Sequence, residues 1–178
     1  MPAMLITEAK KFAIEHHGSQ QYGIFPYSKH LQDVDNVMIR FGLIHEIELR
    51  AAAWLHDILE DTTTVKLVDV QQKFGTEVAN LVYAVTDALG RNRKERKQLM
   101  YEKLKLYQSA FPIKLADRIA NIEWCLLTNI SLLRMYLKEH KEFEGHLRDG
   151  ATNIIMWNHL DYLVDLGQFA VKRADKRL

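Results

Sequence analysis

Apolar residues recur at three- and four-residue spacing along almost the whole chain, and sustained alternation of polar and apolar residues is absent. This periodicity is typical of amphipathic helices. We predict helices at roughly 4–17, 28–41, 46–59, 65–74, 76–90, 91–107, 113–127, 131–148 and 151–168. With no linker or repeat between them, the pattern predicts one all-α domain covering 1–178.

Several residues are expected to begin or end these helices. Ser28 is expected to cap the second helix, and the side chains of 61–64 are expected to cap the helix at 65–74. Gly42 and Gly75 stand where glycine commonly ends a helix. The basic segment 171–178 is expected to be a frayed end.

Composition and charge narrow the class of protein. The 178 residues hold 24 Lys and Arg against 23 Asp and Glu, which disfavours a general polyanion binder. Apolar runs are too short to span a bilayer, and the N-terminus lacks the pattern of a signal peptide. Cys125 is the single cysteine, which fits a reducing compartment. We therefore expect a cytoplasmic protein that binds neither membrane nor nucleic acid.

The segment LHDILEDT holds the densest group of ionisable side chains after an apolar turn. His56 and Asp57 follow Ala51–Leu55, and Glu60 and Asp61 follow one turn later. Buried ionisable groups are costly unless they are paired or ligated. Taken by itself, the segment leaves a metal or acid–base site and a hydrogen-bonded core histidine as comparable interpretations.

Two further segments carry less specific signals. Asp117 and Asn121 are four residues apart, which puts them on one helix face. A lone Asp there is more often a surface residue that pairs with Lys114 or Arg118. His30 lies in the first turn of its predicted helix.

Together, the segments PYSKH, LHDILEDT and KLADRIAN resemble the motifs of the HD-domain phosphohydrolases. More closely, the chain resembles the stand-alone hydrolases that remove the 3′-pyrophosphate of alarmone nucleotides such as ppGpp, over roughly residues 5–148. The resemblance implies an HD-domain helical bundle and one divalent metal ion. It implies four metal ligands: His30, His56, Asp57 and Asp117. This mixed nitrogen and oxygen set suits Mn²⁺, and the lack of thiolates argues against structural zinc.

The resemblance also implies roles around the metal. Glu60 and Asp61 match the pair that positions and deprotonates the attacking water. Asn121 and Tyr136 match positions on the nucleotide side, although Tyr136 could equally be a packing residue.

The stretch 91–97 holds five cations in seven positions. Most charge runs are solvated helix faces, but cations at a helix N-terminus oppose the helix dipole. A phosphate-rich substrate would account for them. We expect Arg93, by resemblance, and Lys97 to contact phosphates.

The chain departs from the family in the loop before PYSKH. Gln21 and Tyr22 stand where the best-known ppGpp hydrolases carry an Arg-Lys pair near the guanine. Tyr can stack on any base, and Gln can pair with adenine. Gln21 and Tyr22 are therefore candidate base contacts, and ppApp is an alternative substrate to ppGpp.

The resulting hypothesis is hydrolysis of a nucleoside 3′-pyrophosphate to pyrophosphate and a nucleoside 5′-di- or triphosphate. One alternative is a phosphatase acting on another nucleotide or small phosphate ester. An alternative of another class is a non-catalytic regulatory module that binds a polyanion. The sequence leaves the oligomeric state open.

Overall fold

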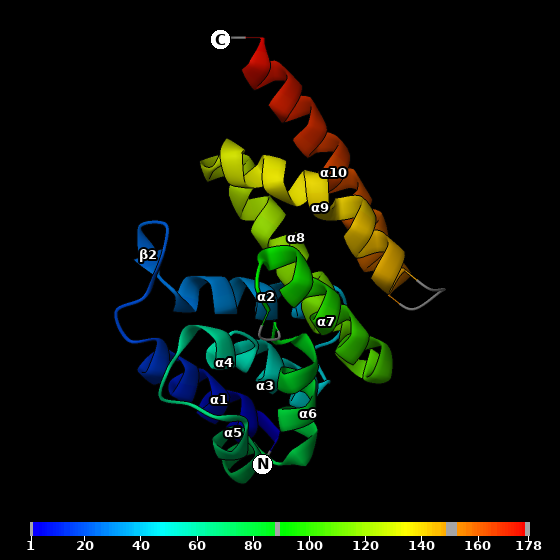
Figure 1. The fold of residues 1–178 in the computed structure, drawn as a ribbon. Helices are drawn as coiled ribbons and strands as arrows, with labels where there is room; N and C mark the ends of the chain where they lie inside the picture. The colour runs from blue at the N-terminus through cyan, green and yellow to red at the C-terminus, as the bar shows by residue number, and fades with distance from the viewer. Residues whose placement is uncertain (1, 88–89, 149–152, 177–178) are drawn as a thin grey trace. The chain divides into compact units, whose positions relative to one another are not determined.

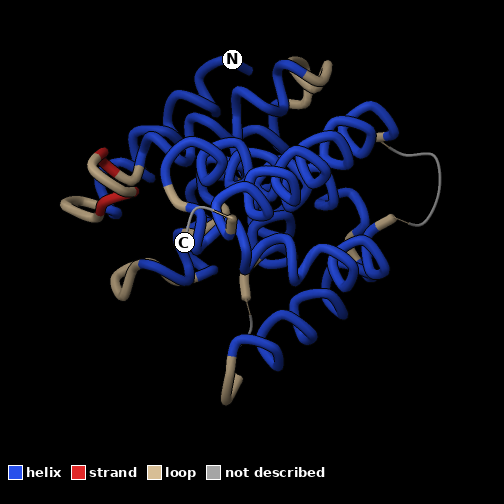
Figure 2. The backbone as a smooth tube through the Cα atoms, turned by 90° about the horizontal axis from the view of Figure 1, so that it is seen from above, coloured by secondary structure: helices blue, strands red, loops and turns tan. Residues whose placement is uncertain are grey.

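The computed structural model describes residues 2–87, 90–148 and 153–176, and these are overwhelmingly helical (Figure 1). The all-α prediction is confirmed. Two short strands, β1 (Gln21–Tyr22) and β2 (Phe25–Pro26), pair antiparallel in the loop after the first helix (Figure 2). The helices are α1 (Pro2–His17), α2 (Ser28–Arg40), α3 (Ile47–Leu55), α4 (Ile58–Asp61), α5 (Leu67–Phe74), α6 (Thr76–Val85), α7 (Arg93–Leu106), the short 3-10 helix η1 (Gln108–Ala110), α8 (Phe111–Thr128), α9 (Ile130–Leu147) and α10 (Ile154–Asp175).

The contacts gather into two compact units, Met1–Lys114 and Leu115–Leu178, and the boundary falls inside α8. The single domain 1–178 stays a prediction. Among the described residues, none of the helices combines the length and apolarity that crossing a bilayer requires.

In the first unit, α3 is the central helix and packs against α1, α2 and α6. Its residues Ala51–Leu55 are buried, as the apolar turn before LHDILEDT predicted. The buried Asp35 on α2 accepts hydrogen bonds from Arg50 Nε at 2.7 Å and from Trp54 Nε1 at 3.1 Å. A buried carboxylate that is fully hydrogen-bonded in this way fixes the register of α2 against α3.

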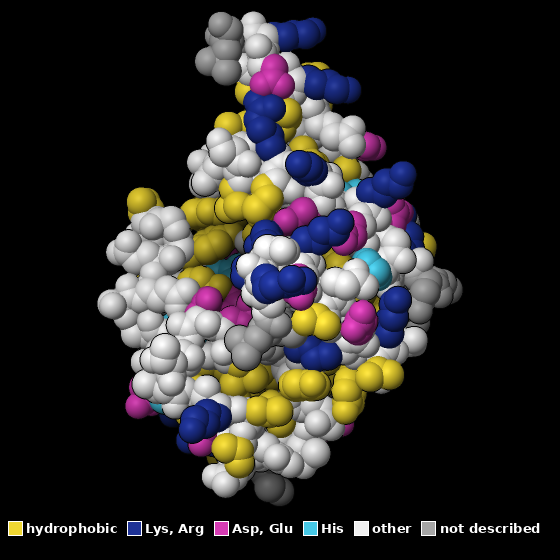
Figure 3. Space-filling model, in the orientation of Figure 1, with side chains coloured by type: hydrophobic (Ala, Val, Ile, Leu, Met, Phe, Trp, Pro, Cys, Tyr) yellow, Lys and Arg dark blue, Asp and Glu magenta, His cyan; other side chains and the backbone are white. Residues whose placement is uncertain are grey.

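In the second unit, α9 and α10 pack along each other. The rings of Phe143 and Trp157 meet at 5.8 Å, and Gly167 leaves room for Leu133 and Leu137. α10 continues to Asp175, whose carboxylate pairs with the Arg134 guanidinium. The predicted frayed end is therefore wrong for 171–175. Figure 3 shows the exposed basic side chains at this end of α10.

Other predicted boundaries also need correction. The helix expected at 46–59 is interrupted at residues 56–57, and the helix expected to reach 90 ends at Val85. Residues 88–89 and 149–152 lie outside the described residues, so the parts of predicted helices that fall there are untested.

Two predicted caps are wrong. Ser28 is the first residue of α2, and Tyr27 is its N-cap. At α5, the Asp69 carboxylate accepts from the backbone N–H of Lys66 at 2.8 Å, so the cap comes from within the helix and not from 61–64. The predicted helix ends at Gly42 and Gly75 are confirmed, and both glycines have φ +89°.

Candidate metal centre and active site

The break between α3 and α4 is the structural feature that forms the site. α3 ends with His56 as its C-cap, and Asp57 is the N-cap of α4 at φ −99° and ψ −1°. A continuous helix would turn consecutive side chains about 100° apart. The change of direction at Asp57 lets the two adjacent side chains converge on one point.

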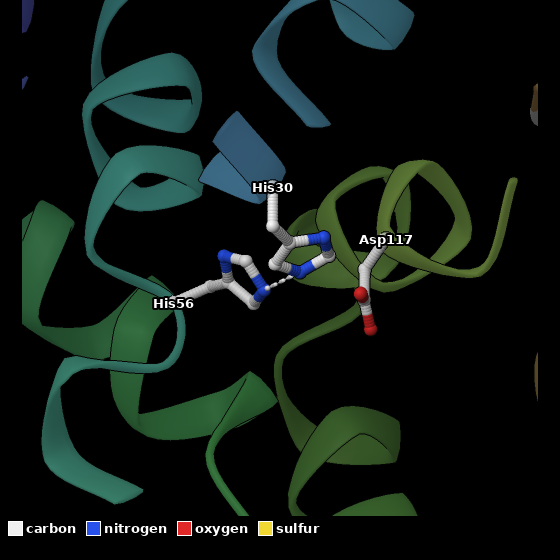
Figure 4. Close-up of side chains that lie close together, drawn as sticks. All are labelled: His30, His56 and Asp117. Atoms are coloured by element: carbon white, nitrogen blue, oxygen red, sulfur yellow. Dashed lines mark hydrogen bonds between the residues drawn. The ribbon is translucent and has the colours of Figure 1, made fainter. Parts of the chain in front are cut away.

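Three ligand atoms meet there. Nε2 of His56 lies 3.3 Å from Nε2 of His30 and 2.9 Å from Oδ2 of Asp57, and His30 Nε2 lies 3.6 Å from the same oxygen. Figure 4 shows the two imidazoles facing each other, one from α2 and one from the α3–α4 junction. Both imidazoles are buried.

A hydrogen bond at Nδ1, the ring nitrogen that faces away from His30, fixes the orientation of His56. Its Nδ1 lies 2.8 Å from the carbonyl oxygen of Ala53, and a carbonyl can only accept. Nδ1 therefore carries the proton, and in the neutral ring Nε2 presents its lone pair toward His30 and Asp57. This is the usual arrangement of a histidine that ligates a metal.

The Asp57 carboxyl is held ionised. Burial alone would raise its pKa, but the charges and hydrogen bonds of His56 and His30 lower it well below 3.8. The Tyr27 hydroxyl donates to Oδ2 over 2.5 Å. Two imidazole nitrogens and an ionised carboxylate within this span fit a divalent transition metal ion, and the described residues thus offer a His/Asp metal site.

Glu60 follows on α4. One carboxylate oxygen accepts from the backbone N–H of Asp87 at 2.5 Å. Although water reaches the side chain, the surrounding protein desolvates the carboxyl, and nearby Asp57 and Asp87 add to this effect against the opposing Lys114 charge. The pKa of Glu60 is thereby raised from 4.5 to about 7. A carboxylate with such a pKa is well suited to accept a proton near neutral pH.

Asp61 is the last residue of α4, and its Oδ2 accepts from Gln20 Nε2 at 2.8 Å. The Gln20 carboxamide oxygen lies 2.8 Å from His17 Nδ1. His17 is buried. Sequence reasoning missed both residues; their only signal was a spacing of three residues just ahead of PYSKH.

Lys103 on α7 was also missed. Its Nζ donates to the carbonyl oxygens of Tyr83, at 2.8 Å, and Thr86. The pKa of Lys103 is lowered because the side chain is partly buried, and the charges of Glu60 and Asp87 oppose this shift only in part. Lys103 therefore ties the end of α6 to α7 beside the backbone group that holds Glu60. Nothing in the sequence around Lys103 distinguishes it from a surface lysine.

The predicted phosphate contacts lie on α7. Arg93 is the first residue of this helix and is exposed, and Lys97 lies one turn later. The N-terminus of α7 is capped by Asn92, whose side chain accepts from the Glu95 backbone N–H at 3.0 Å. This cap and the acidic Glu95 in the first turn offset the unfavourable position of the cations.

The predicted base contacts lie on β1. Gln21 is exposed, and the ring of Tyr22 lies 4.9 Å from that of His30. The β1–β2 pair therefore brings Tyr22 beside His30, which the sequence did not predict. Contact with a base stays a prediction for both residues.

The remaining predicted residues belong to the second unit. Asn121 Nδ2 donates to Asp117, at 3.0 Å to its backbone oxygen and 2.5 Å to Oδ1 (Asp117 is the α8 residue drawn in Figure 4). The Arg118 guanidinium lies 4.8 Å over the Tyr136 ring and donates to the Tyr136 carbonyl at 3.3 Å. Asp117 is thus oriented by Asn121 within one turn of helix.

The HD domain model matches residues 9–131 of this chain. The guanosine-3′,5′-bis(diphosphate) 3′-pyrophosphohydrolase MESH1 of Xenopus tropicalis is 36% identical over 170 residues, which cover 90% of this chain and 93% of that protein. The chain belongs to the HD-domain family, among the guanosine-3′,5′-bis(diphosphate) 3′-pyrophosphohydrolases.

Another relative and a solved structure support the same family assignment for this HD-domain protein. The guanosine-3′,5′-bis(diphosphate) 3′-pyrophosphohydrolase of Aquifex aeolicus (strain VF5) is 36% identical over 165 residues, which are 90% of this chain but 23% of that longer protein. A solved structure described as a metazoan ortholog of SpoT that hydrolyzes ppGpp matches with a TM-score of 0.77 and 28% identity, over 94% of this chain and 96% of that one. The resemblance and the HD-domain helical fold are confirmed. The roles of individual residues stay predictions.

Proposed function

We propose that this chain is a metal-dependent hydrolase that removes the 3′-pyrophosphate of an alarmone nucleotide of the ppGpp type. The products are pyrophosphate and a nucleoside 5′-di- or triphosphate. The main support for this proposal is that the side chains of His30, His56 and Asp57 converge on one point. Two further carboxylates, Glu60 and Asp61, follow on α4. The relatives' names supply the substrate class. The proposal includes a cytoplasmic location.

The metal ligands in this proposal are His30, His56, Asp57 and Asp117, and the ion is Mn²⁺. Asp117 is included because KLADRIAN matches the family motif, and Asn121 holds its carboxylate in place. When bound, such an ion supplies Lewis acidity at the phosphate and lowers the pKa of a bound water.

The remaining steps belong to the protein's own side chains. Glu60 accepts the proton of the attacking water, whose oxygen joins the phosphorus next to the ribose. The bond between that phosphorus and the ribose 3′-oxygen breaks, and the 3′-oxygen takes up a proton. Asp61 orients the water. Arg93 and Lys97 neutralise phosphate charge, and Asn121 and Tyr136 contact the nucleoside.

In this proposal, the two residues of β1 determine which nucleotide base the enzyme prefers. Gln21 offers both a donor and an acceptor, which matches the edge of adenine, and Tyr22 offers a ring for stacking. The family's names favour guanosine substrates. Replacing Gln21 with Ala should therefore lower turnover of ppApp more than turnover of ppGpp, if Gln21 reads adenine.

A product assay tests the proposal. Purified protein with Mn²⁺ receives ppGpp and ppApp in separate reactions, and the products are resolved by chromatography. Pyrophosphate should appear with the wild type and be lost with Asp57→Ala. Asp165→Ala, at an exposed position on α10, is the matched control and should retain full turnover.

Other outcomes would point elsewhere. Release of orthophosphate without pyrophosphate would replace the proposal with a phosphatase acting on another phosphate ester. Salt-sensitive binding of a polyanion without metal-dependent turnover would indicate a regulatory module.

A further inference from the structure

Gln20 links a buried histidine to a carboxylate of the proposed active site. Its Nε2 donates to Asp61 Oδ2 at 2.8 Å, and its Oε1 lies 2.8 Å from His17 Nδ1. A carboxamide has one donor end and one acceptor end. Because the carboxylate can only accept, the oxygen end must face His17, which then donates through Nδ1–H. The reversed carboxamide would put two acceptors together at Asp61.

The backbone of Gln20 is held on both sides. Its N–H donates to the His17 carbonyl at 2.9 Å, and its carbonyl accepts from the Tyr27 N–H at 2.9 Å. Gly18 at φ +52° makes the tight turn between His17 and Gln20, a conformation in which glycine is favoured. Gln20 is therefore fixed to the end of α1 and to the start of α2.

His17 is fixed as well. It is 6% exposed, and its ring stacks on Tyr27 at 4.6 Å between centroids. Tyr27 in turn donates to Asp57. One connected group of side chains thus reaches both Asp57, through Tyr27, and Asp61, through Gln20.

Asp61 needs such support because of its position. It ends a helix of four residues, and the next residue, Thr62, is extended at φ −117° and ψ 140°. The Asp61 side chain is exposed, so packing alone does not select its rotamer. The hydrogen bond from Gln20 supplies the selection.

We propose that Gln20 is a positioning residue that holds Asp61 in the orientation needed for hydrolysis, and that His17 sets the orientation of Gln20. This inference rests on the proposed function of the site. Gln20 occupies Oδ2 of Asp61 and leaves Oδ1 to accept a hydrogen bond from the attacking water. The effect of Gln20 on turnover should pass entirely through Asp61.

A double-mutant cycle with Gln20→Met, Asp61→Asn and the double variant tests this, with kcat and KM measured on ppGpp and ppApp. Gln20→Met keeps the length of the side chain and removes both polar ends. We expect kcat to fall about tenfold, as loss of a hydrogen bond to a charged group would cause. KM should change little. The double variant should be no slower than Asp61→Asn alone.

Two further variants control for folding. Gln32→Met makes the same exchange on α2, where Gln32 accepts from Lys10 and donates to Asn36. Gln32 is two residues after His30 and therefore points to another face of the helix, so this variant should leave kcat unchanged. His17→Phe keeps a ring against Tyr27 while removing Nδ1, and it should lower kcat in the same direction as Gln20→Met. Circular dichroism confirms that each variant is folded.

The outcomes separate the two proposals. If the wild type releases pyrophosphate but the losses from Gln20→Met and Asp61→Asn multiply, Gln20 does not act through Asp61, and the inference is wrong. An unchanged kcat in Gln20→Met also overturns it. A wild type that turns over neither nucleotide refutes the proposed function, and the inference falls with it.

Discussion

The Tyr27 hydroxyl and the Asp57 carboxylate are joined by a 2.5 Å hydrogen bond to Oδ2, the same oxygen that lies 2.9 Å from Nε2 of His56. Tyr27 therefore holds the carboxylate of the proposed metal ligand Asp57 in place. It is part of PYSKH, so one short segment supplies both the proposed ligand His30 and a residue that orients the proposed ligand Asp57.

Replacing Tyr27 with Phe should weaken Mn²⁺ binding about tenfold, because a residue that orients a ligand typically contributes that much to affinity. Calorimetric titration of the metal-free protein measures the effect. Tyr162→Phe removes a hydroxyl from an exposed tyrosine on α10 and is the matched control. Equal affinities in Tyr27→Phe and the wild type would show that Asp57 needs no such support.

Metal binding should stabilise the fold. If the ion binds only the folded state and its free concentration is about 100 times its Kd, it adds about 2.7 kcal/mol to the free energy of unfolding. Thermal unfolding with and without Mn²⁺ should show a rise in Tm that a chelator reverses. Asp57→Asn should abolish the rise, whereas Asp165→Ala should keep it. A rise that persists in Asp57→Asn would place the binding ion elsewhere.

Two glycines of the second unit should respond oppositely to substitution. A Cβ at Gly145 in α9 meets nothing within 4 Å, so Gly145→Ala should raise the free energy of unfolding by about 0.5–1 kcal/mol. At Gly167 a Cβ would lie 3.2 Å from Leu137 and 3.3 Å from Leu133, so Gly167→Val should lower it by about 1–3 kcal/mol. Urea denaturation measures both, and a stabilised Gly167→Val would contradict the α9–α10 packing.

His140 should make the protein less stable in mild acid. Burial lowers its pKa below 6.5, aided by the charges of Arg118 and Arg148 and opposed by Glu144 and Asp161. Below pH 6.5 the unfolded chain therefore binds this proton before the folded chain does, so stability falls as the pH falls. Urea denaturation across this range should show a weaker pH dependence for His140→Gln. His45→Gln, at an exposed position, is the control. An unaltered slope in His140→Gln would assign the acid sensitivity to other groups.

The sequence by itself determined the fold class and indicated the segment that carries the candidate site. Helical periodicity depends on local spacing, and the apolar turn Ala51–Leu55 already indicates that the helix end carrying His56 is buried. His56 and Asp57 are adjacent in the chain, but the convergence of their side chains depends on the break between α3 and α4. Their convergence with His30 was expected only through the resemblance to a family.

Tertiary structure decided the rest. The break at His56–Asp57 interrupts a segment whose periodicity predicts one continuous helix, because packing and hydrogen bonding at Asp57 outweigh local propensity. The last turns of α10 are tied by Arg134, which is 41 residues away from Asp175 in the chain. Gln20 and Asp61 are likewise 41 residues apart. Contacts of this kind leave no periodic trace in the sequence, since they depend on where separate helices meet and not on the spacing of residues within one helix.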